Sequence, residues 1–428
     1  MPVQLHGLRF RLSPNGEQTK RLSRWAGCCR WVFNAALALR ESLYQTTGKA
    51  PNYAALCKQL TAWKQETPWL REPPAMVLQQ AIKDLDDGYK RFFSGQNRRP
   101  GFRARHRWQS SFRIPQHGGL LRVEPLSRSV GRLNLPKLGW IRFRWSRPVV
   151  GDIRSVTLSQ DRCGDWWVAI LVKTVGADVA EPASMDAEHV RGLDLGVAQS
   201  VTLDSGPSIQ LPTPTKGDLK HAAKLARRVS RKQKGSKNRA KAQNKLNRTR
   251  RRWRRQLRDA QHKLSTTLIR ENQAIIVEDL DVQQMTRRAT GKRVRQKSGL
   301  TRSILSQNWG SFRAMLEWKA RAAGVIVERV NPAYTSQRCS SCGLVDADSR
   351  RSQAVFQCTA CGHKENADTN AAKNIRAAGL SSVKARGVLI RPERSNLPRQ
   401  GTTKRVLIGG LLTCLSDTDV AGPGIPAF

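Results

Sequence analysis

The chain has 428 residues, and 76 Lys and Arg against 32 Asp and Glu give it a formal net charge of +44. Hydrophobic residues make up 39% of it, enough for sizeable cores, which excludes a disordered polycation. So much positive charge on a folded chain indicates a polyanionic partner. A small acidic substrate would not require positive charge along the whole chain. No apolar run approaches the ~20 residues of a membrane span, and residues 1–10 lack the apolar region of a signal peptide, so we expect a cytoplasmic protein without membrane contact.

The first part of the chain predicts a strand, a helical bundle and a set of antiparallel strands. Residues 5–12 alternate loosely, as in a strand, and Leu22, Trp25, Cys29 and Val32 recur at helical spacing. Helical patterns continue to about residue 93. Residues 102–174 are then rich in β-branched and aromatic residues separated by turn signals, which predicts a small barrel or sandwich. The N-terminal strand could close the same sheet, with the helices as an insertion.

A second domain begins at about residue 190 with strands and helices in alternation. Residues 191–206 indicate a strand, a tight turn and a second strand, and the apolar run 274–277 is typical of a strand buried on both faces. An amphipathic helix over 304–323 and a strand over 325–330 follow. This alternation predicts an α/β sheet. A further helix is expected near 367–378.

Residues 219–258 carry seven Lys and eleven Arg and no acid, which predicts a basic helical hairpin with its turn near Gly235. A charge run is usually a solvated surface. Eighteen unneutralised charges in forty residues would repel one another strongly, so we favour contact with RNA or an RNA–DNA duplex. The expected contact residues are Arg227, Arg228, Arg231, Lys232, Lys234, Lys237, Arg239, Lys241, Lys245, Arg248, Arg250, Arg251, Arg252, Arg254 and Arg255.

Four of the nine cysteines have the spacing of a zinc site. Cys339 and Cys342 form one CxxC pair and Cys358 and Cys361 form another, with fifteen residues between the pairs. Four thiolates leave no coordination position open for water, so this zinc is expected to be structural. His363 is expected to be a bystander, and the other five cysteines to be small hydrophobes or free thiols.

Three acids of the second domain could form a catalytic centre. Asp194 lies at a strand end between glycines, Glu278 ends the buried strand, and Asp368 lies early in a helix. Each alone has an ordinary interpretation, as a turn residue, a strand exit or a first-turn acid. Together the three acids could converge in the fold. Mg²⁺ prefers hard oxygen ligands, and a cluster of carboxylates supplies them. Two such ions can activate water and stabilise the leaving oxygen of a phosphodiester.

These motifs resemble the TnpB family of transposon-associated RNA-guided DNA endonucleases, which have a RuvC-like nuclease domain and are related to type V CRISPR effectors. GLDLGV, IIVEDL and CGHKENADTNAAKNI match the three nuclease motifs, so the resemblance assigns the catalytic acids to Asp194, Glu278 and Asp368. A zinc ribbon lies between the second and third motifs, as in the family. One departure is Asn366, where many members have a further Asp.

The resemblance implies a multidomain α+β and α/β architecture. An RNase H-like (RuvC) nuclease with an inserted zinc ribbon would follow an N-terminal β-barrel, the wedge, which itself holds an inserted helical recognition bundle. The expected bounds are 1–12 and 101–182 for the wedge barrel, 13–100 for the recognition domain, 187–335 for the nuclease, 336–362 for the zinc ribbon, 363–380 for the C-terminal nuclease helix and 381–428 for a flexible basic tail.

The implied activity is Mg²⁺-dependent cleavage of double-stranded DNA beside a short target-adjacent motif. The implied partners are a guide RNA made from the transposon end and the target DNA, with two Mg²⁺ per active site, one Zn²⁺ and no small-molecule substrate. Base pairing would then read the sequence while the protein holds the duplex. The alternatives are a compact type V CRISPR effector, a nuclease-inactive RNA-guided repressor and, less favoured, a strand-transfer transposase.

Overall fold

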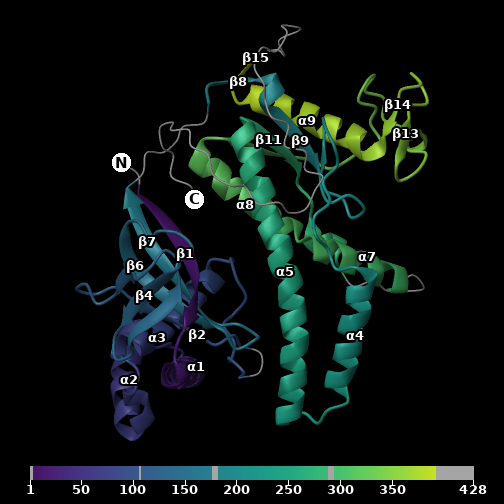
Figure 1. Ribbon diagram of the computed structural model, residues 1–428. Coiled ribbons are helices and arrows are strands. Elements are labelled where there is room, and N and C mark those ends of the chain that lie inside the picture. The colour runs from purple at the N-terminus through teal and green to yellow at the C-terminus, as the bar shows by residue number, and fades with distance from the viewer. Residues whose placement is uncertain (1–2, 106–107, 176–181, 288–293, 392–428) are drawn as a thin grey trace. The chain divides into compact units, whose positions relative to one another are not determined.

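The computed structural model describes residues 3–105, 108–175, 182–287 and 294–391. The chain divides into two compact units, residues 1–177 and 178–427, and each contains its own hydrophobic core (Figure 1). Among the described residues, no helix is both long enough and apolar enough to cross a bilayer.

The first unit contains a seven-stranded antiparallel sheet of order β2-β6-β7-β1-β5-β4-β3. The N-terminal strand β1 pairs with β7 along most of its length and with β5 at its end, which confirms that it belongs to the same sheet. The strand pairings of the described residues leave β2 and β3 at the two edges. The strands are β1 (Val3–Ser13), β2 (Ser111–Pro115), β3 (Arg122–Pro125), β4 (Val130–Leu135), β5 (Gly139–Arg144), β6 (Asp152–Gln160) and β7 (Trp166–Val175).

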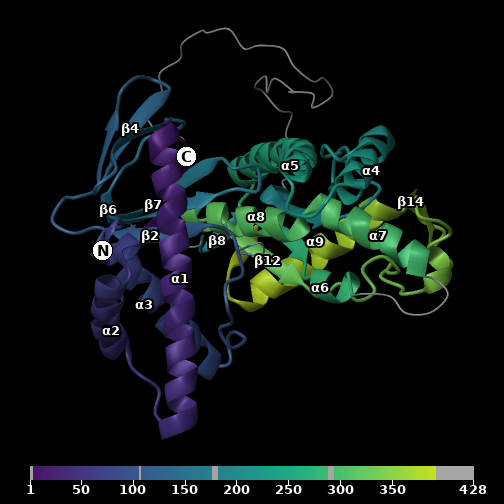
Figure 2. The same cartoon turned by 90° about the horizontal axis from the view of Figure 1, so that it is seen from below.

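Three helices lie between β1 and β2 in the sequence, as predicted (Figure 2). They are α1 (Gly16–Thr47), α2 (Tyr53–Glu66) and α3 (Ala75–Phe93), with a 3₁₀ turn η1 (Pro68–Arg71) before α3. Asn15 and Gln18 form a reciprocal capping box that fixes the start of α1. The predicted stripe of Leu22, Trp25, Cys29 and Val32 is buried in the core that the helices share with the sheet.

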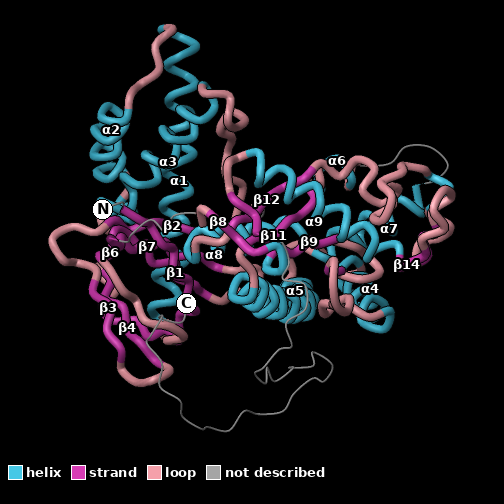
Figure 3. The backbone as a smooth tube through the Cα atoms, turned by 90° about the horizontal axis from the view of Figure 1, so that it is seen from above, coloured by secondary structure: helices cyan, strands magenta, loops and turns pink. Residues whose placement is uncertain are grey.

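The second unit is built on a four-stranded sheet of order β10-β9-β11-β12 (Figure 3). β11 (Ala274–Glu278) runs parallel to β9 (Val190–Asp194) and to β12 (Ile326–Val330), and β10 (Thr202–Leu203) is antiparallel to β9. All five residues of β11 are buried, which confirms a strand covered on both faces. Its side chains alternate between the two cores: Ile275 and Val277 in one, and Ala274 and Ile276 in the other.

Helices cover both faces of this sheet. Helix α9 (Ala367–Ala385) crosses one face over β9 and β11, and α5 (Lys237–Glu271) and α8 (Trp309–Ala323) contribute to the core on the other (Figure 1). Gly192 and Gly379 allow the close approach of α9, because a Cβ atom at Gly192 would collide with the backbone of Ala372 and one at Gly379 with Ile276. Helix α9 therefore covers the face of β9 on which Gly192 lies.

The predicted basic hairpin consists of α4 (Lys216–Ser230) and α5. Gly235 has a φ of 86° in the connection between them, as its predicted place in the turn requires. Ala222, Leu225, Val229 and Leu246 pack between the two helices, so only one stripe of each helix is apolar. The remaining surface of the hairpin is left to its charged side chains.

Two predicted boundaries differ from the structure. The helix expected over 304–323 is divided at Asn308, whose φ is 55°, into α7 (Val294–Gln307) and α8. The helix expected to end near residue 380 continues to Ala385, and Gly379 within it packs closely against Ile276. β15 (Leu389–Arg391) then pairs with β8 (Ser184–Asp186), so the predicted flexible tail was wrong for residues 381–391. The rest of that tail, 392–428, lies outside the described residues.

The remaining elements of the second unit are short. They are two 3₁₀ turns, η2 (Ala187–His189) and η3 (Ala347–Ser349), the helix α6 (Val282–Met285), and β13 (Val355–Gln357) and β14 (Lys364–Asn366), which pair in the cysteine-containing segment.

Candidate active site and zinc cluster

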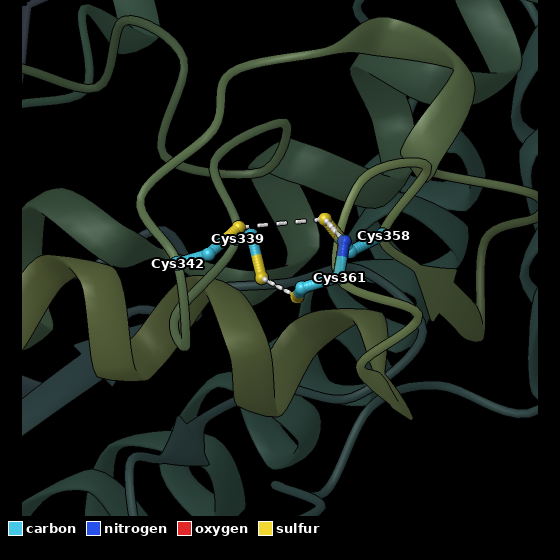
Figure 4. Close-up of side chains that lie close together, drawn as sticks. All are labelled: Cys339, Cys342, Cys358 and Cys361. Carbon is cyan, nitrogen blue, oxygen red and sulfur yellow. Dashed lines mark hydrogen bonds between the residues drawn. The ribbon is translucent and has the colours of Figure 1, made fainter.

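The four predicted zinc ligands come together in the segment between β12 and α9 (Figure 4). The Sγ atoms of Cys339 and Cys361 are 3.7 Å apart, and those of Cys342 and Cys358 are 3.6 Å apart. Tetrahedral zinc with Zn–S bonds of about 2.3 Å places its sulfur atoms about 3.8 Å apart, so this donor set fits Zn²⁺. His363 contacts Ser340 and Glu365 instead, as expected for a bystander.

The three predicted catalytic acids lie at one end of the second sheet. Asp194 ends β9 and Glu278 ends β11, and since these strands are parallel and adjacent, their carboxyl ends meet at the same edge. Asp368 lies in the first turn of α9, the helix that crosses both strands. Among the described residues, only the four cysteines form a group of three or more metal-ligand residues with all ligand atoms within 4.8 Å, so the three carboxylates are more widely spaced than that.

Electrostatics link Asp194 to the other two acids. Burial, and to a lesser extent the nearby carboxylates of Glu278 and Asp368, raise the pKa of Asp194 to about 7. Burial also raises the pKa of Glu278 and of Asp368. The ionised carboxylates are destabilised at this site, so a cation bound beside them would be stabilising.

Two residues that interact with these acids were not predicted from the sequence. Arg350, between the two cysteine pairs, has Nη2 3.5 Å from Oδ1 of Asp368 and lowers the pKa of both aspartates. Thr335, in the loop after β12, donates a hydrogen bond from Oγ1 to Oε1 of Glu278 at 2.5 Å. The sequence alone does not single out one arginine among many or one threonine in a loop. Their roles depend on how the segment between β12 and α9, which contains the four cysteines, folds back toward the acids.

Asn366, the one departure from the family pattern, is the N-cap of α9. Its Oδ1 accepts hydrogen bonds from the backbone N–H groups of Asp368 at 3.0 Å and Thr369 at 3.2 Å. An aspartate could cap the helix in the same way, so the change to asparagine keeps the start of α9 and removes one negative charge near the acids.

Two known proteins each match 91% of this chain. InsQ of Escherichia coli strain K12, which bears the name of an RNA-guided DNA endonuclease, is 39% identical over 399 residues, covering 91% of this chain and 96% of InsQ. This chain belongs to the IS605 OrfB/TnpB family. A Streptomyces pristinaespiralis protein with the same descriptive name is 35% identical over 396 residues, covering 91% of this TnpB-family chain and 92% of the relative.

Three family models match separate parts of the TnpB-family chain. They are described as "Helix-turn-helix domain" of OrfB_IS605 at residues 1–49, "Probable transposase" of OrfB_IS605 at 172–289, and "Cas12f1-like, TNB domain" at 309–375, which contains the cysteine cluster. Within the first match the structure has β1 and the single 32-residue helix α1. A Cas12f1–guide RNA–target DNA complex resembles the fold at a TM-score of 0.51 and 13% identity, covering 85% of this chain and 83% of that one.

The raised pKa of Asp194 predicts that this acid destabilises the fold without metal. Its pKa rises from 3.8 to about 7, so the folded state binds more protons than the unfolded state between these values, and stability falls as the pH rises through that range. We expect Asp194→Asn, without divalent ions at pH 8, to raise the melting temperature by about 2–4 °C. The difference should shrink as the pH falls toward 4, and a lower melting temperature at pH 8 would contradict this.

Proposed function

We propose that this protein is an RNA-guided DNA endonuclease of the IS605 TnpB type, which hydrolyses target DNA with Mg²⁺ held by Asp194, Glu278 and Asp368. The observation that carries the proposal is the placement of these acids at one sheet edge, where β9 and β11 end and α9 begins. Acids are scarce in a chain of net charge +44. A bound cation would explain three buried acids with raised pKa values at this position, where Glu278 and Asp368 also raise the pKa of Asp194.

The donor set fits magnesium. Carboxylate oxygens are the hard ligands that Mg²⁺ prefers, and two ions would supply an activated water and stabilisation of the leaving oxygen. Arg350 offsets part of the negative charge at Asp368, and its guanidinium is suited to hold a phosphate oxygen of DNA beside the acids. The carboxylates of Asp194 and Glu278 are held by the ends of buried strands, which limits their movement.

The hairpin of α4 and α5 is proposed to hold the guide RNA or its duplex with DNA. A cavity of about 600 Å³ lies between the helices, and its basic lining residues are Arg228, Arg231, Lys232, Lys241 and Lys245. Most of the predicted contact residues are exposed. Arg239 has another role, because its Nη1 donates to the carbonyl oxygens of Val229 at 2.9 Å and Lys232 at 2.8 Å and so closes the turn.

Removing charge from this groove should weaken RNA binding and make it less dependent on salt. For Arg231→Gln, Lys241→Gln and Lys245→Gln combined, we expect the log–log salt slope to fall by ~2–2.7, from ~0.7–0.9 per lost phosphate contact. The matched control changes Arg302, Arg321 and Lys384 to Gln, which are exposed basic residues of the same unit. Equal effects of the two triple variants, measured by filter binding, would show that bulk charge and not the groove holds RNA.

For the first unit, we propose that the sheet acts as the wedge barrel and that α1, α2 and α3 act as the recognition bundle. Together they would contact the short target-adjacent motif in double-stranded DNA. The continuous core that joins helices and sheet supports one rigid body for this task. The RuvC-like nuclease at 187–335, the ribbon at 336–362 and the helix from 363 would form the cutting unit.

The decisive experiment is exchange of the guide. The protein, expressed with its own flanking DNA, should co-purify with one defined RNA that persists through a moderate salt wash. Changing only the 3′ stretch of that RNA should redirect cleavage completely to the matching DNA. A mixture of cellular RNAs, with cleavage that ignores the RNA supplied, would instead indicate a non-specific RuvC-like nuclease.

The alternatives are less well supported. A nuclease-inactive repressor would not need the three acids. A Cas12f1 protein of Sulfoacidibacillus thermotolerans is 43% identical, but only over 84 residues and 19% of this chain, whereas the match to InsQ covers 91%. A strand-transfer transposase would need a tyrosine nucleophile or a different acidic domain, and the chain has only four tyrosines.

A further inference from the structure

The loop between β12 and the zinc ligands folds back onto the end of β11. Its Thr335 and the acid Glu278 are both 8% exposed, and the Thr335 hydroxyl lies 2.5 Å from Oε1 of Glu278. The same hydroxyl is 3.1 Å from the carbonyl oxygen of Pro332, so its single proton has a second acceptor nearby. Tyr334 has a φ of 65°, in the left-handed region that few non-glycine residues adopt, which shows that the surrounding structure holds this turn in place.

Two asparagines of α9 connect this turn to the zinc cluster. Nδ2 of Asn374 donates to the carbonyl oxygens of Thr335 at 2.9 Å and Arg338 at 2.7 Å. Asn370 donates to the same Arg338 oxygen at 2.8 Å and accepts from the backbone N–H of Ser340 at 2.9 Å. Arg338 and Ser340 flank the zinc ligand Cys339, so the two asparagines form hydrogen bonds with the backbone on both sides of that ligand.

These contacts form one continuous path between the two candidate metal sites. It runs from the backbone around Cys339 through Asn370 and Asn374 to Thr335, and from Thr335 to Glu278. The helix that carries the two asparagines also carries Asp368 in its first turn. The side chains of the path are all buried: Asn370 is fully buried, Asn374 is 6% exposed, and Thr335 and Glu278 are each 8% exposed. Water cannot readily replace a hydrogen bond lost at such a site, so losing one carries a free-energy cost.

We propose that Thr335 is a positioning residue through which the zinc ribbon sets the orientation of the Glu278 carboxylate, and thereby the affinity of the acids for magnesium. This inference rests on the proposed function of those acids. The ribbon then acts on the nuclease centre by holding one of its ligands in place. A purely local role for Thr335, as a partner that satisfies a buried carboxylate, would need neither Asn374 nor the ribbon.

The test compares Thr335→Val, which has the same shape without the hydroxyl, with Thr335→Ser, which keeps the hydroxyl. Mn²⁺ serves as the probe, and its dissociation constant is measured by electron paramagnetic resonance on the full-length protein bound to guide RNA. Loss of an outer-shell hydrogen bond typically weakens metal binding by ~10–100-fold. We expect about a 10-fold rise for Thr335→Val, with zinc content and target binding unchanged, and recovery to within about 3-fold for Thr335→Ser.

The coupling to the ribbon is tested by Asn374→Ala, a change at a side chain that bonds to neither candidate metal ligand. We expect the Mn²⁺ dissociation constant to rise while zinc content remains one per chain. Wild-type affinity in Thr335→Val would overturn the positioning role, and wild-type affinity in Asn374→Ala would overturn the link to the ribbon. If Glu278→Gln also bound Mn²⁺ normally, the proposed function itself would fail, so the two failures are distinguishable.

Discussion

Replacing Glu278 with alanine should abolish guided DNA cleavage, lowering its rate by at least about 10³-fold. The reason is that Glu278 lies at the end of a strand buried on both faces, beside Asp194, and no other described acid of β11 can replace it. Asp194→Ala and Asp368→Ala should have the same effect. Single-turnover cleavage of a guided target in Mg²⁺ measures the loss.

Binding should survive these changes. Carboxylates repel a polyanion and attract it only through bound metal, so guide RNA retention and target binding should be equal to wild type. Asp259→Ala is the matched control, because that acid is exposed on α5, where it pairs with Lys263 at 2.9 Å. A Glu278→Ala protein that cuts guided targets at a near-normal rate would show that the catalytic centre lies elsewhere.

Cys358→Ser should remove zinc from the protein and unfold the segment around it. Metal binding and folding are coupled in such small units, and structural zinc sites contribute about 10–16 kcal/mol of apparent binding free energy. The hydrophobic core of the segment is small and consists of Cys339, Phe356, Cys358 and Ala367, so two of its four members are zinc ligands. We expect elemental analysis to fall from one zinc per chain to none.

Limited proteolysis should then cut the segment between β12 and α9 first. Cys163→Ser is the control, because Cys163 is also buried but belongs to the first unit, which does not contain the cluster. It should keep the zinc and the wild-type cleavage pattern. A Cys358→Ser protein that contains no zinc yet resists proteolysis and cuts DNA normally would refute a structural role for the metal.

Local patterns predicted most of the second unit. The apolar run at 274–277 is β11, the basic run is the hairpin, and Asp194 and Glu278 lie at strand ends as their positions suggested. These features depend on residues close in sequence, where spacing and burial can be inferred from the chain itself. The two CxxC pairs gave the zinc ligands for the same reason.

The predictions failed where the role of a residue depends on contacts with residues distant in the sequence. Gly379 has the appearance of a helix stop, but α9 passes through it because Ile276 of β11 occupies the space of a side chain. Asn308 divides α7 from α8 without a proline or glycine. Arg350 and Thr335 reach the acids only because the ribbon segment returns to the sheet, which no local pattern encodes.

The packing of α9 across β9 and β11 also has a consequence for how the protein is made. Asp194 and Asp368 are 174 residues apart (368 − 194). At about 5–20 residues per second, a ribosome would take roughly 10–35 s to travel from one to the other. Until α9 has been made, the face of β9, and later of β11, that it will cover stays bare. With Asp368 in the catalytic centre, as proposed, the growing chain cannot cut DNA, and nuclease activity first becomes available when translation has passed the cysteine-containing segment and released α9.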